Sequence, residues 1–453
     1  MPRPMLLANA TLIDGLTDRA RPHMSVLVDG GRISEVVPGD VPAGDAEVVD
    51  LGGKTLLPGM IDTHVHATVM DRECLRLFLG AGVTTIRDVG GRLDKTLRLR
   101  DELTSGEVVG PRMYVYGPLL DGEDASFSKK SPLYEILDFI PSPEHVPGKI
   151  GSLLEAGVDG VKLYFTLPPE TAKAVIRFVD HRVPVTGHLG YSHSMELIEA
   201  GIDGLEHVWI SPYNDICATE ARFGPGLGVS SMMDPNFWRL TMRGWDEADL
   251  QGPGAKAWFG AMVDHQVHMG TTLDLLWVAK CGIEAACADP DRRFIPPMAL
   301  EPQRHLAARH PERTDWDVHP GFDLDLGARA LEKHQEATRI LHEAGGVVVG
   351  GTDCGGLAYP PPGFALLREI ELMAEAIGAM AAIKSVTSVA ARYLRRDDDV
   401  GAVASGRFAD LLVVDGDPLR DPRELRKLVT VYRGGVAYDP ASLLADCPTQ
   451  DAA

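Results

Sequence analysis

The chain has 453 residues, of which 45% are hydrophobic, and a formal net charge of −21 from 65 acidic and 44 basic residues. This length exceeds what one compact core needs, so we expect two or more structural units, and the composition is that of a folded protein. The excess of acidic residues argues against nucleic acid or an anionic membrane surface as a partner.

The N-terminal residues contain short β-type runs, among them MLLANATLI and MSVLVDGGRISEVV. The Asp-Gly-Gly in the second run is typical of a hairpin turn. The C-terminal runs RFADLLVVDGD and KLVTVYRGGVAYD have the same character. We therefore predict one small β-sandwich domain built from both termini, residues 1–57 and 402–453.

The middle of the chain, residues 58–401, alternates short apolar runs with segments of helical pattern. One such segment, ARALEKHQEATRILHEAGG, has apolar residues on one face and ends at Gly-Gly. This alternation predicts an α/β fold, a (β/α)8 TIM barrel that forms the catalytic domain. The eight expected strands are TLLPGMIDTHVH, GVTTIRDVG, RMYVYGPLL, DGVKLYF, VPVTGHL, DGLEHVWI, GTTLDLLWV and GVVVGGTDC.

Two connections in this pattern are long, between residues 209 and 271 and between residues 278 and 347. Loops of this length after barrel strands typically carry extra helices that shape a pocket. The six cysteines form no CxxC pair, and the N-terminus has no long apolar segment. These features predict a soluble cytoplasmic protein with no membrane partner.

His64 and His66 lie two residues apart at the end of the first expected barrel strand. Side chains at this spacing point to the same face of a strand, so both imidazoles can approach one divalent metal ion. Two polar residues at a strand end are the alternative interpretation. His188, His207 and Asp353 stand at the ends of the fifth, sixth and eighth expected strands. The ends of barrel strands meet at one mouth, so we expect these five residues to converge.

Lys162 lies inside the apolar run DGVKLYF, where a buried ammonium is costly without a partner. A lysine amine that reacts with carbon dioxide becomes an anionic carbamate, which can bridge two cations. The alternative is a salt bridge at the end of the barrel.

These motifs resemble the amidohydrolase superfamily, in particular its metal-dependent imidazolonepropionase- and prolidase-like group. The resemblance covers almost the whole chain and rests on LLPGMIDTHVH, GVTTIRDVGG, DGVKLYF, VTGHLG, AGIDGLEHV, GGTDCG and VASGRFADLLVVDGDP. It implies that His64, His66 and Asp353 hold one metal ion and that His188 and His207 hold the other. It also implies that carbamylated Lys162 and a hydroxide bridge the two ions.

Two divalent ions lower the pKa of a bridging water from about 16 toward about 7. Asp353, the expected catalytic residue, would take the proton of the hydroxide and deliver it to the leaving nitrogen. Zinc is the expected metal, and manganese and iron are also compatible with these ligands. Tyr164 and His193 are candidate substrate contacts, each with a packing role as the alternative. Arg87 and Asp88 are expected to form a buried ion pair, and Cys354 to turn away from the metals.

The substrate expectation rests on the segment GPLLDGEDASFSKK, which contains no histidine where dipeptidase-like relatives carry one. Together with the aromatic residues Phe127, Trp209, Phe237 and Trp277 near the expected mouth, this favours a small-molecule amide, carbamate or urea. A dipeptidase or N-acyl-amino-acid hydrolase is the enzyme alternative, and a non-catalytic barrel scaffold is the remote one. A homo-oligomer is compatible with the sequence.

Overall fold

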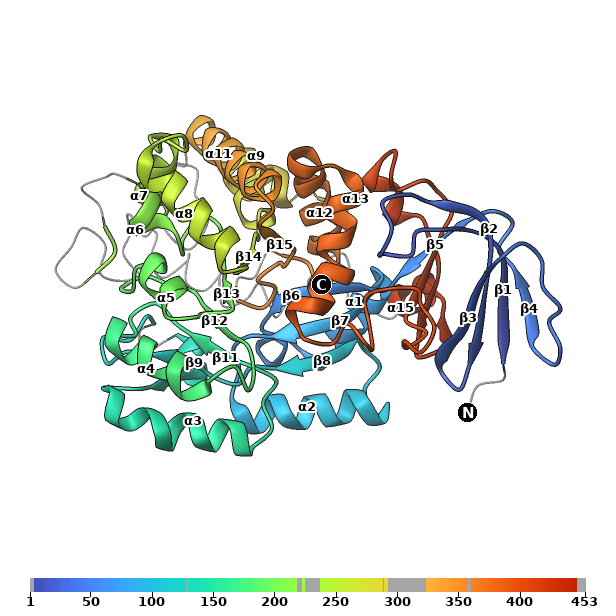
Figure 1. The fold of residues 1–453 in the computed structure, drawn as a ribbon, viewed down its shortest axis with the longest axis horizontal. Helices are drawn as coiled ribbons and strands as arrows, with labels where there is room; N and C mark the ends of the chain where they lie inside the picture. Colours follow the sequence, from blue (N-terminus) through green and yellow to red (C-terminus); the bar gives the residue numbers. More distant parts are fainter. Residues whose placement is uncertain are drawn as a thin grey trace.

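The computed structural model describes residues 4–127, 129, 131–217, 222–224, 237–287, 289–291, 323–356 and 360–445. The chain has a mixed α/β architecture, with parallel strands among helices and a separate sheet built from N-terminal and C-terminal strands (Figure 1). The described helices are α1 Leu75–Gly80, α2 Leu93–Ser105, α3 Val146–Glu155, α4 Pro169–Val179, α5 Ser194–Glu199, α6 Tyr213–Ile216, α7 Phe237–Asp246, α8 Pro253–Asp264, α9 Asp274–Cys287, α11 Leu324–Glu343, α12 Phe364–Ile377, α13 Ala379–Ser385, α14 Ser388–Tyr393 and α15 Pro440–Ala445.

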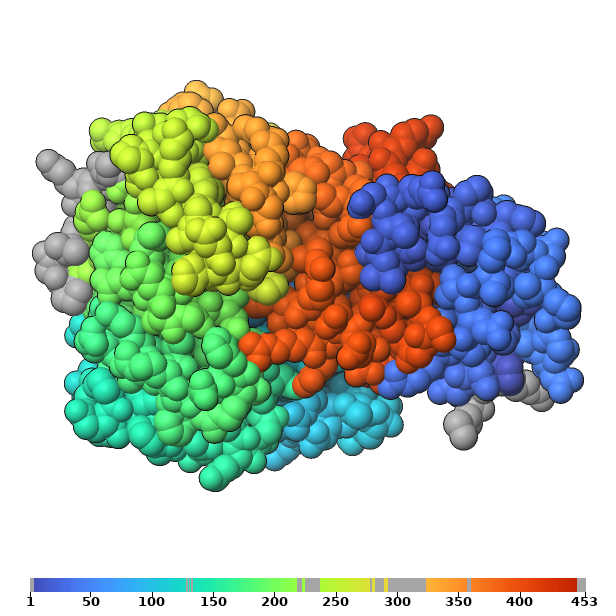
Figure 2. All heavy atoms as spheres, in the orientation of Figure 1, coloured from blue at the N-terminus to red at the C-terminus, as the bar shows by residue number. Residues whose placement is uncertain are grey.

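The sheet of N-terminal and C-terminal strands has eight members, from β18 at one edge to β3 at the other. Its strands are β1 Met5–Leu12, β2 Arg21–Asp29, β3 Arg32–Pro38, β4 Glu47–Asp50, β5 Thr55–Pro58, β16 Leu411–Val414, β17 Leu428–Arg433 and β18 Val436–Tyr438. Strands β5 and β16 pair antiparallel in its centre, with Leu56 opposite Val413. The N-terminal residues form a lobe next to C-terminal residues in Figure 2. Leu56, Val413 and Val26 belong to a small core of this sheet.

The remaining strands lie in two parallel sheets. The first consists of β6 Met60–Val65, β7 Val83–Asp88 and β8 Arg112–Val115. The second, in spatial order, consists of β10 Leu137–Phe139, β9 Leu119–Asp121, β11 Val161–Leu163, β12 Val185–Gly187, β13 Gly204–Leu205, β14 His268–Gly270 and β15 Val347–Val349. Every residue of β6 and β7 is buried, as expected of parallel strands covered on both faces.

The segment after β15 runs beside β6 and joins the two parallel sheets. The backbone N–H of Asp353 donates to the carbonyl of His64 at 2.8 Å, and the N–H of His66 donates to the carbonyl of Cys354 at 2.8 Å. Val65 and Cys354 form an isolated parallel bridge. The two chain segments that carry His64, His66 and Asp353 are therefore fixed to each other by their backbones.

The seventh expected strand, GTTLDLLWV, is wrong for most of its length. The strand β14 begins earlier, at His268, and ends at Gly270, whereas helix α9 begins at Asp274. The carboxylate of Glu369 in α12 accepts a hydrogen bond from the N–H of Asp274 at 2.8 Å. An unpaired N–H at the start of a helix needs such a partner, and here a distant helix supplies it. The third expected strand is also divided, into β8 and β9.

The predicted hairpin turn is present between β2 and β3, and additional helices do lie in the long connections, α6 to α8 in the first and α11 in the second. Of the helices that the structure describes, none combines the length and the apolar character that crossing a membrane requires.

Candidate metal centre

The predicted ligands lie at or just beyond the C-terminal ends of parallel strands. His64 and Lys162 are each the last residue but one of their strands, β6 and β11. His188 directly follows β12, His207 comes two residues after β13, and Asp353 follows β15. The C-terminal ends of parallel strands share one edge, so these side chains approach one another although 289 positions separate the first from the last.

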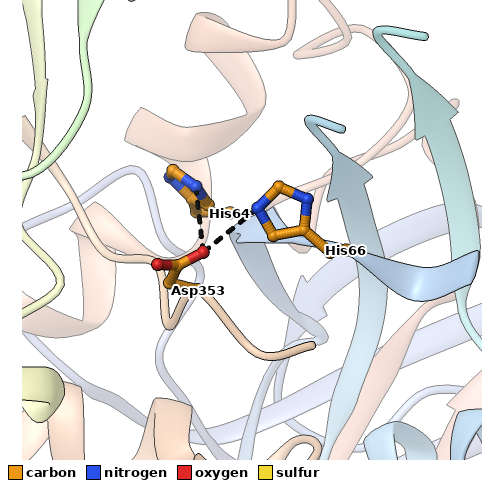
Figure 3. A group of neighbouring side chains, drawn as sticks. All are labelled: His64, His66 and Asp353. Atoms are coloured by element: carbon orange, nitrogen blue, oxygen red, sulfur yellow. Dashed lines mark ion pairs between the residues drawn. The ribbon is translucent and has the colours of Figure 1, made fainter. Parts of the chain in front are cut away.

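His64, His66 and Asp353 form a compact group whose three potential ligand atoms lie within 4.8 Å of one another (Figure 3). Oδ1 of Asp353 is 3.4 Å from Nε2 of His64 and 3.1 Å from Nε2 of His66. Both imidazoles are buried. Nδ1 of His66 is 2.8 Å from the carbonyl of Gly90, which accepts its hydrogen, and Nε2 is the ring nitrogen that faces the carboxylate. This group is a candidate metal site.

His207 and His188 extend the group on the side of His64. The ring centroids of His64 and His207 are 4.5 Å apart, and those of His188 and His207 are 4.6 Å apart. Nδ1 of His207 is 2.8 Å from the hydroxyl of Thr272, which itself donates to the carbonyl of Thr271 at 2.7 Å. The hydroxyl oxygen can therefore accept the Nδ1 hydrogen of His207, which leaves Nε2 of that ring free to bind a metal.

Three residues of this group have left-handed backbone conformations that are uncommon for side-chain-bearing residues. The φ angles are 60° at His207, 50° at Thr272 and 58° at Asp353. Such conformations cost about 1–3 kcal/mol each and concentrate at functional sites. Here they turn the chain at the strand ends, so that neither His207 nor Asp353 continues the pleat of the strand before it.

Lys162 is fully buried, and its Nζ has no hydrogen-bond partner among the described residues. Burial lowers its pKa to about 8, against the opposing influence of the carboxylates of Glu206 and Asp353. Nε2 of His188 likewise lacks a partner within the described part of the chain. Two buried polar atoms without partners would cost several kcal/mol in a site that received no ligand.

Burial also lowers the pKa of His64, His188 and His207 well below 6.5, so these rings are neutral near pH 7. A metal ligand must offer a lone pair, and a neutral imidazole has one. Burial acts in the same direction on His66, but the hydrogen bond and charge of Asp353 outweigh it and raise the pKa of His66. The same contact lowers the pKa of the Asp353 carboxyl, although burial opposes it.

This donor set fits a divalent transition metal. Four imidazoles and one carboxylate are ordinary ligands for zinc, manganese or iron, and the unpartnered Nζ of Lys162 and Nε2 of His188 lie in the same buried region.

The two candidate substrate contacts have different surroundings. The ring of Tyr164 is 5.0 Å from that of His188 and 5.7 Å from that of Phe127. Tyr164 therefore lies against the predicted metal ligands. His193 is at the start of α5, where Nδ1 lies 3.0 Å from Oδ1 of Asp215. Its side chain is 42% exposed.

Aromatic side chains line the group on the side of His188 and His207. The Trp209 ring is 5.1 Å from that of His207, and the half-buried ring of Trp238 lies 4.8 Å beyond it. Phe237 is 6.3 Å from Trp209 and belongs to the same layer. Trp277, which the sequence also placed near the mouth, instead packs under the guanidinium of Arg368 at 3.7 Å.

The expected ion pair between Arg87 and Asp88 is wrong. Arg87 pairs instead with Glu206, at 2.6 Å between Nη2 and Oε1, because successive side chains on β7 point to opposite faces. Asp88 accepts hydrogen bonds from the backbone N–H groups of Ala67 and Gly90. Cys354 turns away from the ligands, as expected, and its thiol contacts the carbonyl of Pro360 at 3.2 Å.

Glu206 was not predicted from the sequence, although its Oε2 is 2.8 Å from Nδ1 of His64. A signal was present, because an acidic residue in the apolar run DGLEHVWI must find a partner. Its partner is 142 positions away, and only the fold reveals it.

The chain is similar to known proteins in both sequence and fold. The family model described as "Amidohydrolase family" matches residues 256–437, a segment that includes Asp353. An imidazolonepropionase of Pseudomonas aeruginosa (strain LESB58) is 29% identical over 163 residues, which is 35% of this chain and 40% of the relative. The match thus spans less than half the length of that relative.

Solved structures share the fold over nearly the whole chain. A Xaa-Pro dipeptidase with bound methionine in its active site has a TM-score of 0.67 at 21% identity, covering 96% of this chain and 100% of the other. A bottromycin amidohydrolase has a TM-score of 0.69 at 22% identity, covering 98% of this chain and 88% of the other.

Proposed function

Because the chain belongs to the amidohydrolase superfamily, we propose that it is a hydrolase, a binuclear metal enzyme that cleaves C–N bonds in small molecules. The observation that carries the proposal is the buried group of His64, His66 and Asp353, with His188, His207 and the unpartnered amine of Lys162 next to it. The activities named for the relatives are not transferred to this chain. The bond and the substrate proposed for it are argued from its own residues.

The proposal includes a closed (β/α)8 barrel for residues 58–401 and a sandwich domain from the chain ends. The hydrogen bonds between residues 350–354 and β6 support closure on one side. A barrel gathers the strand ends at one mouth, which is where such enzymes carry their active sites.

In this proposal His64, His66 and Asp353 would hold one divalent ion, and His188 and His207 would hold the second. Lys162 would lie between them as a carbamate, formed when its neutral amine adds to carbon dioxide and releases a proton. Its pKa of about 8 leaves a reactive fraction of amine near neutral pH. The bound ions would supply acidification of water and polarisation of a carbonyl.

Asp353 is the residue proposed to move the proton. Its carboxylate is ionised at neutral pH, since the contact with His66 lowers its pKa. It can therefore accept the proton of the attacking water and donate it to the departing nitrogen, which leaves as a neutral amine. Burial of the surrounding histidines excludes bulk water and strengthens these interactions.

For the substrate, we propose a neutral amide, carbamate or urea with an aromatic or other apolar group. The layer formed by the buried Trp209 and Phe237 and the half-buried Trp238 supports this, because it makes the surroundings of His207 apolar on that side. A dipeptidase would need a cation for the substrate carboxylate. Arg87 is not free for that role, because it is buried and paired with Glu206.

The metal part of the proposal is tested by elemental analysis of protein purified without chelator and then reconstituted with zinc. We expect close to two metal ions per chain. A content that stays at zero after reconstitution would overturn the proposal.

Lys162→Ala should lose metal and activity together, with partial recovery in small carboxylates that replace the carbamate. Lys95→Ala, at an exposed position of α2, is the matched control and should behave as the native protein. Full activity in Lys162→Ala would show that Lys162 only braces the strand.

A hydrolysis screen of the zinc-loaded protein tests the substrate class, with anilides, carbamates and phenylureas set against dipeptides and N-acyl amino acids. We expect the neutral aromatic compounds to have the highest kcat/KM. A dipeptide that exceeds all of them would overturn this ranking and favour the dipeptidase alternative.

A further inference from the structure

Glu206 is a fully buried carboxylate whose two oxygens have different partners. Oε2 lies 2.8 Å from Nδ1 of His64. Oε1 accepts hydrogen bonds from Nη2 of Arg87 at 2.6 Å and from the hydroxyl of Thr186 at 2.6 Å. One oxygen therefore contacts a predicted ligand, and the other is anchored in the interior.

The anchor is itself held firmly. The guanidinium of Arg87 lies 4.5 Å from the ring centroid of Tyr393 and 5.0 Å from that of Tyr116. The hydroxyl of Tyr393 is 3.2 Å from Oε1 of Glu206. If the carboxylate of Glu206 rotated away from His64, the buried Arg87 would lose its counter-ion. Leaving a buried charge unpaired is costly, so the carboxylate is held in place.

The predicted histidine ligands differ in what receives their Nδ1 hydrogen. His66 donates to the carbonyl of Gly90, and His207 contacts the hydroxyl of Thr272. Both acceptors are neutral, whereas His64 donates to the charged carboxylate of Glu206. An anionic acceptor fixes the ring orientation and raises the basicity of the other ring nitrogen, which strengthens its bond to a metal.

We infer that Glu206 is a positioning residue that sets the affinity of the metal position of His64, His66 and Asp353, acting through Nδ1 of His64. The inference rests on the proposed metal function. It assigns a role in metal loading to the Arg87–Glu206 pair, beyond the neutralisation of one buried charge by another. The metal affinity of the position formed by His188 and His207 should depend less on Glu206, because Nδ1 of His207 has a different partner, the hydroxyl of Thr272.

The test is a titration of the metal-free protein with zinc in competition with a chromophoric chelator, which yields stepwise binding constants without any substrate. Glu206→Gln keeps an oxygen that can accept the hydrogen of His64 but removes the charge. Loss of such a partner typically weakens metal binding 10- to 100-fold, and we expect about this change in one of the two zinc constants, that of the position of His64, His66 and Asp353. The other constant should change much less, because His207 keeps its own partner in Thr272.

Thr186→Val is the matched control. It removes a hydrogen bond to the other oxygen of Glu206 and leaves the contact with His64 in place. We expect it to lower the unfolding temperature of the metal-free protein without changing either zinc constant. If Glu206 served only as the counter-ion of Arg87, Glu206→Gln would behave in the same way, and an unchanged zinc constant in that folded variant would overturn the inference.

If Glu206→Gln fails to fold because Arg87 is left unpaired, the combination with Arg87→Met removes the stranded charge, and the same titration is decisive. If one of the two zinc constants is weakened in the double variant, the inference is supported, and if both are native, it is overturned. A native protein that binds no zinc would instead overturn the proposed function itself, so the two failures are distinguishable.

Discussion

Gly90→Ala should weaken metal binding by steric pressure on the ring of His66, although it changes none of the predicted ligands. Gly90 follows β7, and its carbonyl is 2.8 Å from Nδ1 of His66. A Cβ at this position would lie 2.6 Å from Cε1 and 2.7 Å from Nδ1 of His66, and 2.7 Å from Cδ2 of Leu119. The backbone of Gly90 is not among the glycines with positive φ, so alanine meets no conformational obstacle there.

The magnitude follows from these distances. Carbon atoms in contact are normally about 3.5–4.0 Å apart, so the imidazole of His66 must move by roughly 1 Å. Metal–ligand distances tolerate only about 0.2 Å, so the displaced ring cannot keep its place beside Asp353 without strain. Overpacking typically costs about 1–3 kcal/mol. If the metal-bound state bears that cost, zinc affinity falls roughly 10- to 100-fold.

The assay is the zinc titration against a chromophoric chelator, together with thermal unfolding of the metal-free protein. Gly148→Ala in α3 is the control, because a Cβ there meets nothing within 4 Å. It should leave zinc affinity unchanged. Native zinc affinity in a folded Gly90→Ala variant would refute the reasoning, because it would mean that His66 does not need its present position to bind metal.

Two further predictions concern proton transfer and acid stability. Asp353→Asn keeps one ligating oxygen but cannot accept a proton, so kcat should fall by about 10² to 10⁴ while metal content, measured on the same preparation, stays largely intact; normal metal with near-normal kcat would remove Asp353 from the mechanism. Burial lowers the pKa of His334 in α11 to about 3 from 6.5, so its stabilising contribution is complete above pH 6.5 and is lost as the pH falls toward 3. Between pH 7 and pH 5 this costs about 2 kcal/mol, and His334→Gln should reduce the pH dependence of the free energy of unfolding in urea by that amount; an equal dependence in both proteins would contradict the burial argument.

The parts of the centre that depend on local periodicity were predictable from sequence. The spacing of His64 and His66 indicated one shared face, and the two rings do approach the same carboxylate. The barrel pattern then predicted that Asp353 would join them, because strand ends converge wherever the strands lie in the sequence. The left-handed turns at His207 and Asp353 were not predictable, since neither residue is a glycine.

Other features depended on tertiary contacts that no local pattern carries. An apolar run such as GTTLDLLWV is compatible with a buried strand or a buried helix, and here Glu369 from α12 caps the helix that begins at Asp274. The pairing of Arg87 was also beyond the sequence, because its partner Glu206 is 119 positions away. A neighbouring acid, Asp88, offered a simpler and wrong answer.

The antiparallel pairing of β5 with β16 has a consequence for folding during synthesis on the ribosome. Roughly 350 residues separate the two strands, and at about 5–20 residues per second a ribosome needs on the order of 20 to 70 s to produce the second after the first. During that interval one edge of β5, whose Leu56 and Leu57 end fully buried, has no partner strand. An unpaired apolar edge is a template for aggregation, so the nascent N-terminal segment is prone to aggregate until β16 has been made.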